Sequence, residues 1–160
     1  MVMEVLLLDG ISGFPVDDRT RADSLQFKRL CYTLASYSNG KLLSFEEPHV
    51  SQNFYKVELG WENKSTSTYI LLNSSYPFVA FASSVQYFDI DYVDDSLSND
   101  VNAFSTGFRV LPVVVLNQRL ILEERTQTVL NENSLNKAEL NQIFHWKPKT
   151  VGEVIFNFWD

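Results

Sequence analysis

The sequence is poor in the features that stabilise secreted proteins or anchor membrane proteins. It has a single cysteine, Cys31, in 160 residues, which excludes an intramolecular disulfide. No stretch approaches the roughly 18–20 consecutive apolar residues of a transmembrane helix. The apolar start of the chain lacks the basic region of a signal peptide, and we interpret residues 2–8 as a first β-strand. We therefore expect a cytoplasmic protein, because a reducing compartment also suits this cysteine usage.

Glycine and proline are scarce as well. Six Gly and five Pro are too few for a linker-rich or low-complexity chain. The 45% of hydrophobic and 21% of charged residues are ordinary for a globular protein and exclude intrinsic disorder. A chain of 160 residues is the common size of one domain. We expect a single globular domain that spans residues 1–160.

Basic residues are absent from one long interval. The chain holds 13 Lys and Arg against 20 Asp and Glu, a net charge of −7, and none of the basic residues lies between Lys64 and Arg109. Acidic residues crowd the second half of that interval, at Asp89, Asp91, Asp94, Asp95 and Asp100. Such a balance opposes non-specific binding to nucleic acid and to anionic lipid, so we expect neither as a partner.

The motifs of several large enzyme classes are missing too. The sequence contains no G-x-S-x-G, P-loop, G-x-G-x-x-G, C-x-x-C or H-E-x-x-H pattern. We therefore expect no cofactor, and a binding protein rather than an enzyme.

One helix is predicted near the start of the chain. The acidic pair at residues 17–18 suits a helix N-terminus, and the Asn39–Gly40 pair suits a left-handed C-cap after about residue 37. Cys31 lies on the apolar face of this helix, together with Phe27, Leu30 and Leu34. We interpret it as a buried, unreactive thiol.

A run of β-strands follows. Apolar and polar residues alternate cleanly in residues 55–61, as expected for a half-buried antiparallel strand. Similar patterns predict strands at residues 41–45, 68–73, 78–84 and 85–93. These segments together indicate an antiparallel meander. Beyond it we predict a short helix at 96–104, a strand at 108–116 that Pro112 confines to an edge or a bulge, and a helical or irregular segment at 117–133.

Two helices are predicted at the C-terminus. The first covers residues 134–146 with Ser134 as its cap, and the second begins at Val151, behind a capping box of Thr150 and Glu153. The last helix is apolar almost all round and must be buried. We expect it to pack on the sheet; the alternatives are a docking face or a homodimer contact. The predicted class is α+β: a mainly antiparallel meander sheet packed by an N-terminal helix and two C-terminal helices.

The strongest chemical signal is the acidic segment F-D-I-D-Y-V-D-D-S. Asp89 and Asp91 point to the same face of a strand, because side chains alternate with period two, and Asp94 and Asp95 follow in a loop. Neighbouring carboxylates repel one another unless they are solvated, protonated or bridged by a cation. Oxygen ligands of this kind suit Ca²⁺ or Mg²⁺, although the EF-hand spacing is absent.

A second candidate lies in the segment F-E-E-P-H. Glu46 or Glu47 with His49 could form an acid–base pair in a cleft or ligate a metal. Pro48 stands between them and precludes the helical geometry of an E-x-x-H metal site. Acid–base chemistry would require this turn and the acidic strand to line one cleft.

Two hypotheses for function result. The first is a non-enzymatic protein-binding or regulatory module whose acidic surface around residues 89–100 contacts a basic protein partner. The second is a metal-dependent enzyme or a Ca²⁺- or Mg²⁺-binding protein that uses Asp89, Asp91, Asp94 and Asp95, with proton transfer by Glu46, Glu47 or His49. Homodimer formation is a further possibility for the assembly.

Overall fold

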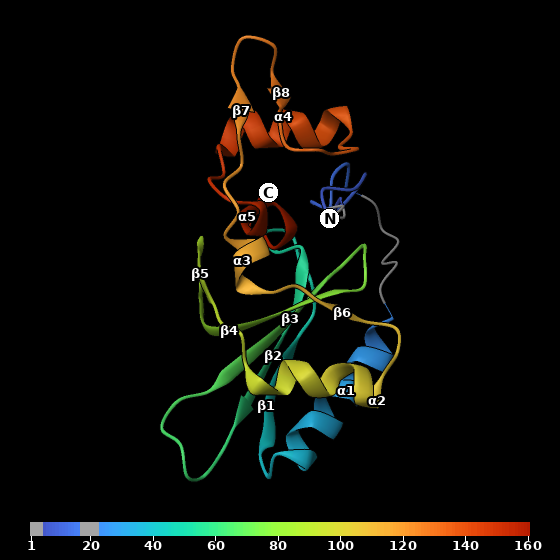
Figure 1. Cartoon of the computed structure of the whole chain (residues 1–160), viewed down its shortest axis with the longest axis vertical. Helices are drawn as coiled ribbons and strands as arrows, with labels where there is room; N and C mark the ends of the chain where they lie inside the picture. Colours follow the sequence, from blue (N-terminus) through green and yellow to red (C-terminus); the bar gives the residue numbers. More distant parts are fainter. Residues whose placement is uncertain (1–4, 17–22) are drawn as a thin grey trace.

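The computed structural model describes residues 5–16 and 23–160, and it confirms the predicted α+β class (Figure 1). A mainly antiparallel sheet lies between an N-terminal helix and a C-terminal layer of helices. The helices are α1 (Ser24–Tyr37), the 3-10 helix η1 (Ser96–Asp100), α2 (Val101–Phe104), α3 (Val113–Leu116), α4 (Lys137–Trp146) and α5 (Val151–Ile155). The strands are β1 (Lys41–Glu46), β2 (Phe54–Gly60), β3 (Thr68–Asn73), β4 (Phe78–Gln86), β5 (Asp89–Tyr92), β6 (Arg109–Val110), β7 (Leu122–Glu123) and β8 (Thr128–Val129).

The sheet is the predicted meander. Strands β1 to β5 pair in chain order, each antiparallel to the next. The short β6 returns parallel to the start of β4. Consequently β1 and β5 stand at opposite edges of the five-stranded meander.

Helix α1 covers one face of the sheet. Its buried residues pack against the odd-numbered side chains of β2, such as Val57 and Leu59, and against Phe81 of β4. Cys31 lies in this core and is fully buried, as predicted. The helix ends in a Schellman motif: Asn39 adopts φ 61°, and Gly40 N–H donates to the Ala35 carbonyl at 2.8 Å.

The C-terminal segment covers the other face. Side chains of Phe54, Leu71 and Ala80 point to it from the sheet, and the tail residues Phe156 and Phe158 pack on them. Phe54 contacts both tail rings edge to face, with centroids 5.8 and 5.4 Å away. The predicted packing of the tail on the sheet therefore holds within one chain, although α5 ends at Ile155 and residues 156–160 continue without helix.

Two strand predictions need correction. Residues 2–4 of the first predicted strand lie outside the described residues, and residues 5–8 contain only a single bridge from Leu7 to Asn133. The strand predicted at 108–116 ends at Val110, because Pro112 caps α3 and cannot donate to a ladder. The acidic pair at 17–18 also lies outside the described residues, and Asp23 caps α1 instead.

Two further assignments need correction near the C-terminus. The segment 117–133 contains the β7–β8 hairpin, which projects from the body of the molecule (Figure 1). Helix α4 is capped by Asn136 and not by Ser134, because the Asn136 side chain accepts from Glu139 N–H at 2.8 Å. The capping box of Thr150 and Glu153 at the start of α5 is present as predicted.

No helix in residues 5–16 and 23–160 combines the length and the apolar character needed to cross a membrane.

Candidate functional site

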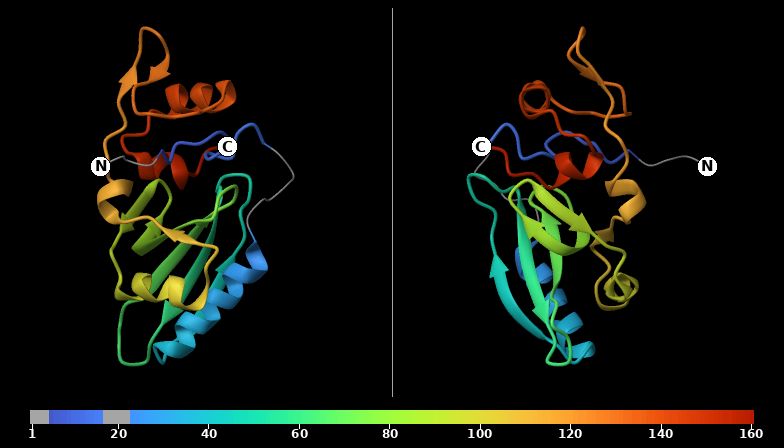
Figure 2. Two further views of the ribbon diagram at one scale, coloured as in Figure 1. Left: turned by 45° about the vertical axis from the view of Figure 1, so that its right-hand side comes forward. Right: turned by 90° about the vertical axis from the view of Figure 1, so that its left-hand side faces the viewer.

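The acidic strand β5 lies at an edge of the sheet. Asp89 and Asp91 are both exposed and point to the same side of the strand, as their spacing predicts. A two-residue turn, Tyr87–Phe88, joins β4 to β5, and Phe88 adopts the left-handed φ of 60°. This turn carries the acidic strand to the rim of the sheet (Figure 2, right).

The next two aspartates bind the backbone of the same chain. The Asp94 carboxylate accepts a hydrogen bond from Val113 N–H at 2.9 Å and thereby holds the start of α3. Asp95 is the N-cap of η1 and accepts from Leu97 N–H at 2.9 Å. Asp95 is a local cap, whereas Asp94 binds a segment 19 positions away. The predicted group of four carboxylates therefore divides into Asp89 and Asp91, which are exposed on the strand, and Asp94 and Asp95, which accept backbone hydrogen bonds.

Aromatic side chains surround a pocket beside β5. The pocket has a volume of about 230 Å³ and is lined on one side by Asp89 and Ile90 of the strand. Lys147 and Lys149 line it from the α4–α5 linker. Its aromatic lining consists of Phe88, Tyr92, Trp146, Phe156, Phe158 and Trp159. We call this cavity the aromatic pocket, although polar and charged residues contribute about as much of its surface as apolar ones do.

Tyr92 fixes α5 against this strand. Its hydroxyl donates to the Gly152 carbonyl at 3.2 Å, and the backbone of Gly152 lies so near the ring that a Cβ there would be 3.0 Å from the Tyr92 Cε2. Burial, with a smaller effect of the Glu153 carboxylate, raises the pKa of Tyr92 above its ordinary value. Tyr92 therefore remains a neutral hydrogen-bond donor across the physiological range.

Two aromatic side chains protrude at the tip of the β4–β5 turn. Tyr87 is 65% exposed and Phe88 is 43% exposed. Their rings meet edge to face at 4.5 Å, and Phe88 also lies 5.1 Å from Trp146. Exposed aromatic residues are enriched at protein–protein interfaces. The turn therefore gives the acidic strand an apolar border.

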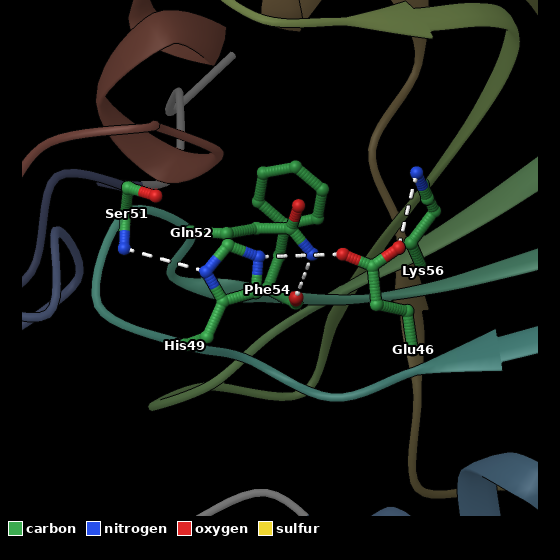
Figure 3. Close-up of polar contacts among 6 residues, drawn as sticks. All are labelled: Glu46, His49, Ser51, Gln52, Phe54 and Lys56. Atoms are coloured by element: carbon green, nitrogen blue, oxygen red, sulfur yellow. Dashed lines mark hydrogen bonds and ion pairs between the residues drawn. The ribbon is translucent and has the colours of Figure 1, made fainter.

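The E-E-P-H segment begins at the end of β1, at the opposite edge of the meander from β5. Glu46 and His49 form a small charged cluster there with Lys56 (Figure 3). The Glu46 carboxylate lies 3.3 Å from His49 Nε2 and 3.2 Å from Lys56 Nζ. His49 Nδ1 accepts from Ser51 N–H at 3.5 Å, within a turn closed by the His49–Gln52 bridge. One imidazole nitrogen thus has a partner within the turn and the other has a partner at the end of β1, so His49 connects the turn to the strand. Glu47 is exposed beside it.

The two candidate clusters do not meet. Glu46 ends β1 and Asp89 begins β5, at opposite edges of the meander. Four strand spacings of about 4.8 Å put those edges roughly 19 Å apart. His49 borders a separate cavity of about 630 Å³ with Asp9 and Asn53, while Asp89 lines the aromatic pocket. Among the described residues, His49 and Asp89 therefore line two different cavities.

No metal centre is evident in the described part of the chain. Within residues 5–16 and 23–160, no three His, Cys, Asp or Glu side chains come close enough to hold one ion together. The metal-dependent alternative gains no support from this geometry.

Sequence reasoning missed a buried polar network that holds both chain ends on the sheet. Asn73 Nδ2 donates to the carbonyls of Ile11 and Ile155 at 2.8 and 2.7 Å. Asn157 N–H donates to Asn53 Oδ1 at 2.8 Å. The three asparagines are visible in the sequence, but the partners through which they join distant segments lie more than 40 residues away, so the sequence gives no sign of these contacts.

A buried carboxylate completes this network. Glu139 is fully buried, and its two oxygens accept from Gly10 N–H at 2.8 Å, Ser12 N–H at 2.9 Å and Asn136 N–H at 3.1 Å. The Ser12 hydroxyl donates to it as well. The bonds from Gly10 and Ser12 hold the loop at residues 9–13 against α4, and the bond from Asn136 N–H belongs to the capping box of α4, so Glu139 has a structural role.

Comparisons with protein-family models, with curated proteins and with solved structures found no match to this chain.

Proposed function

We propose that the protein is a non-enzymatic binding module whose acidic surface around residues 89–100 contacts a basic protein partner. The observation that carries the proposal is the exposed pair Asp89 and Asp91 on an edge strand, bordered by the exposed rings of Tyr87 and Phe88. Interfaces combine such charged groups with aromatic anchors, and charge complementarity accelerates association.

The charge distribution supports a basic partner. Residues 65–108 include all of β3, β4 and β5 and contain no Lys, Arg or His, so no cation of these strands neutralises Asp89 and Asp91. Exposed charges of one sign attract a partner of the opposite sign over distances of about 8 Å at physiological salt.

Binding to a basic probe tests this proposal. The probe is a fluorescein-labelled block peptide, Lys-Lys-Lys-Lys-Val-Phe-Val, and its fluorescence anisotropy reports the affinity. We expect Asp89→Asn/Asp91→Asn to bind about tenfold more weakly, because two exposed ion pairs contribute up to about 1 kcal/mol each. Added salt should reduce the affinity of the parent protein more than that of the variant.

A matched control separates position from net charge. Glu62 and Glu132 are exposed and lie outside the proposed surface, so Glu62→Gln/Glu132→Gln changes the net charge by the same amount. This variant should bind the block peptide like the parent protein. Equal weakening in both variants would show that only net charge matters and would refute the proposed surface.

A further inference from the structure

The edge strand β5 is open to a further strand. Within the described chain β5 pairs with β4 alone, and its other side faces outward in Figure 2, right. Unpaired N–H and C=O groups on such an edge can pair with another extended chain. The strand is therefore a candidate for recognition of a partner through its backbone.

The opposite edge is less suited to this role. The register of β1 and β2 shifts between Leu42 and Ser44, so the extra residue of that bulge lies in β1 itself. In the β4–β5 pair the shift lies between Ala82 and Ser84, which puts the extra residue in β4 and leaves β5 regular. A bulge disrupts pairing on the strand that carries it. Strand addition is thus favoured at β5 over β1.

The two faces of β5 would select alternate side chains of an added strand. Asp89 and Asp91 are exposed on one face, whereas Ile90 and Tyr92 pack toward the C-terminal layer. The aromatic pocket lies beside this strand and is lined by Ile90 and Tyr92, with Asp89 also among its lining residues. Side chains on one face of neighbouring strands lie about 5 Å apart and pair by charge and by apolar contact. An added strand would present basic residues to the aspartates and an apolar residue to the pocket.

The size of the pocket favours a single side chain, and the six aromatic rings among its lining residues offer that side chain an apolar contact. Its volume of about 230 Å³ falls below the roughly 300–1,000 Å³ of sites that hold small molecules. Lys147 and Lys149 offset Asp89 and Glu153 along its border, and Lys147 Nζ already pairs with Glu124 at 3.2 Å. A charged anchor would thus gain little, while aromatic walls suit an aromatic or aliphatic one.

Charge also decides between a second copy of this chain and a different partner. Two β5 strands side by side would bring Asp89 and Asp91 of both copies together, and like charges opposite each other destabilise a strand pair. A basic segment has the complementary charge.

We propose that β5 binds an extended segment of a partner protein by strand addition, and that this segment alternates basic and apolar residues with one apolar side chain in the aromatic pocket. This inference rests on the proposed function, because it specifies how the basic partner is held.

Peptides of identical composition test the inference. The alternating peptide is fluorescein-labelled Lys-Val-Lys-Phe-Lys-Val-Lys, and the block peptide used above has the same residues in another order. We expect the alternating peptide to bind at least tenfold more tightly than the block peptide. N-methylation of the amides that face β5 should remove this advantage, because it deletes the backbone donors and leaves the charges in place.

Each outcome has a distinct meaning. Strand addition is overturned if the two peptides bind with equal affinity. It is also overturned if N-methylation has no effect on binding, whichever alternate set of backbone amides is methylated. The proposed function then still stands if the block peptide remains sensitive to Asp89→Asn/Asp91→Asn. Absence of binding by both peptides overturns the proposed function together with the inference.

Discussion

Single asparagine side chains connect segments that lie far apart in this sequence. Asn73 is fully buried; it donates to the Ile11 and Ile155 carbonyls, and its Oδ1 accepts from Ser75 and Tyr76 N–H groups at 2.8 and 2.9 Å. One side chain thus satisfies four backbone groups. A buried backbone group left without a partner costs about 1–3 kcal/mol.

We predict that Asn73→Ala lowers the free energy of unfolding by at least about 3 kcal/mol, because several buried groups lose their partner together. Urea unfolding measured by tryptophan fluorescence gives this value. The control is Asn141→Ala at an exposed position of α4, which should stay within about 0.5 kcal/mol of the parent. Equal effects at the two positions would contradict the role of the network.

The buried cysteine makes a prediction about pH. Burial raises the pKa of the Cys31 thiol above its ordinary value, so the native state keeps this proton when the unfolded chain loses it above about pH 8.5. The unfolded state then binds fewer protons, and the free energy of unfolding falls by about 1.4 kcal/mol per pH unit from this group. Tyr92, whose pKa is also raised, adds to the fall above about pH 10.

We predict that the free energy of unfolding of Cys31→Ala falls less steeply than that of the parent protein between about pH 8.5 and pH 10, because the thiol contribution is missing. The measurement is urea unfolding at several pH values for both proteins, because all other groups contribute equally to the two curves. Parallel curves for Cys31→Ala and the parent would mean that the thiol ionises in the native state.

Residue roles were only partly predictable from the sequence. The burial of Cys31 follows from local periodicity, and the shared face of Asp89 and Asp91 follows from strand geometry. The hydrogen bond from Val113 N–H at the start of α3 to Asp94 was not predictable, because the two residues lie 19 positions apart and the sequence gives no sign of their contact. Tertiary hydrogen bonds of this kind decide which carboxylates bind the backbone of their own chain.

At the scale of elements, local patterns predict best where local interactions dominate. The strands of the meander follow alternation, and the start of α5 follows its capping box. Predictions failed where short elements depend on distant contacts, as in the β7–β8 hairpin and in α3. Elements of two to four residues have too little periodicity to be recognised in a sequence.

Helix α5 has only five residues, so its capping box matters for stability. Thr150 Oγ1 accepts from Glu153 N–H at 3.2 Å, while the Glu153 carboxylate accepts from Thr150 N–H. We predict that Thr150→Ala lowers the free energy of unfolding by about 1 kcal/mol. Thr66→Ala in the exposed β2–β3 turn is the matched control and should change it by less than about 0.5 kcal/mol. Chemical denaturation of the two variants distinguishes these values.

At the scale of the whole molecule, the C-terminal tail packs the C-terminal layer of helices onto the sheet. Val151, Val154 and the residues from Ile155 to Trp159 are all buried. Each Å² of apolar surface that these residues remove from water stabilises the folded state by about 25 cal/mol. The tail therefore belongs to the core of a single chain.

We predict that Phe156→Ala lowers the free energy of unfolding by about 3–5 kcal/mol, because Phe156 is fully enclosed between Phe54 and Tyr92. The control, Phe104→Ala, removes a ring that is 42% exposed and should cost less than about 1 kcal/mol. Deletion of residues 151–160 should give insoluble protein. A soluble, folded truncated chain would contradict the role of the tail in the core.

The central claim is that β5 and its aromatic pocket form the binding surface. The most direct measurement is an NMR titration of ¹⁵N-labelled protein with the alternating Lys-Val-Lys-Phe-Lys-Val-Lys peptide. We predict that amide signals of Asp89–Tyr92 and the indole signal of Trp146 shift together and saturate, while those of the turn from His49 to Gln52 do not move. Shifts at that turn, or spread evenly over all acidic positions, would contradict the account.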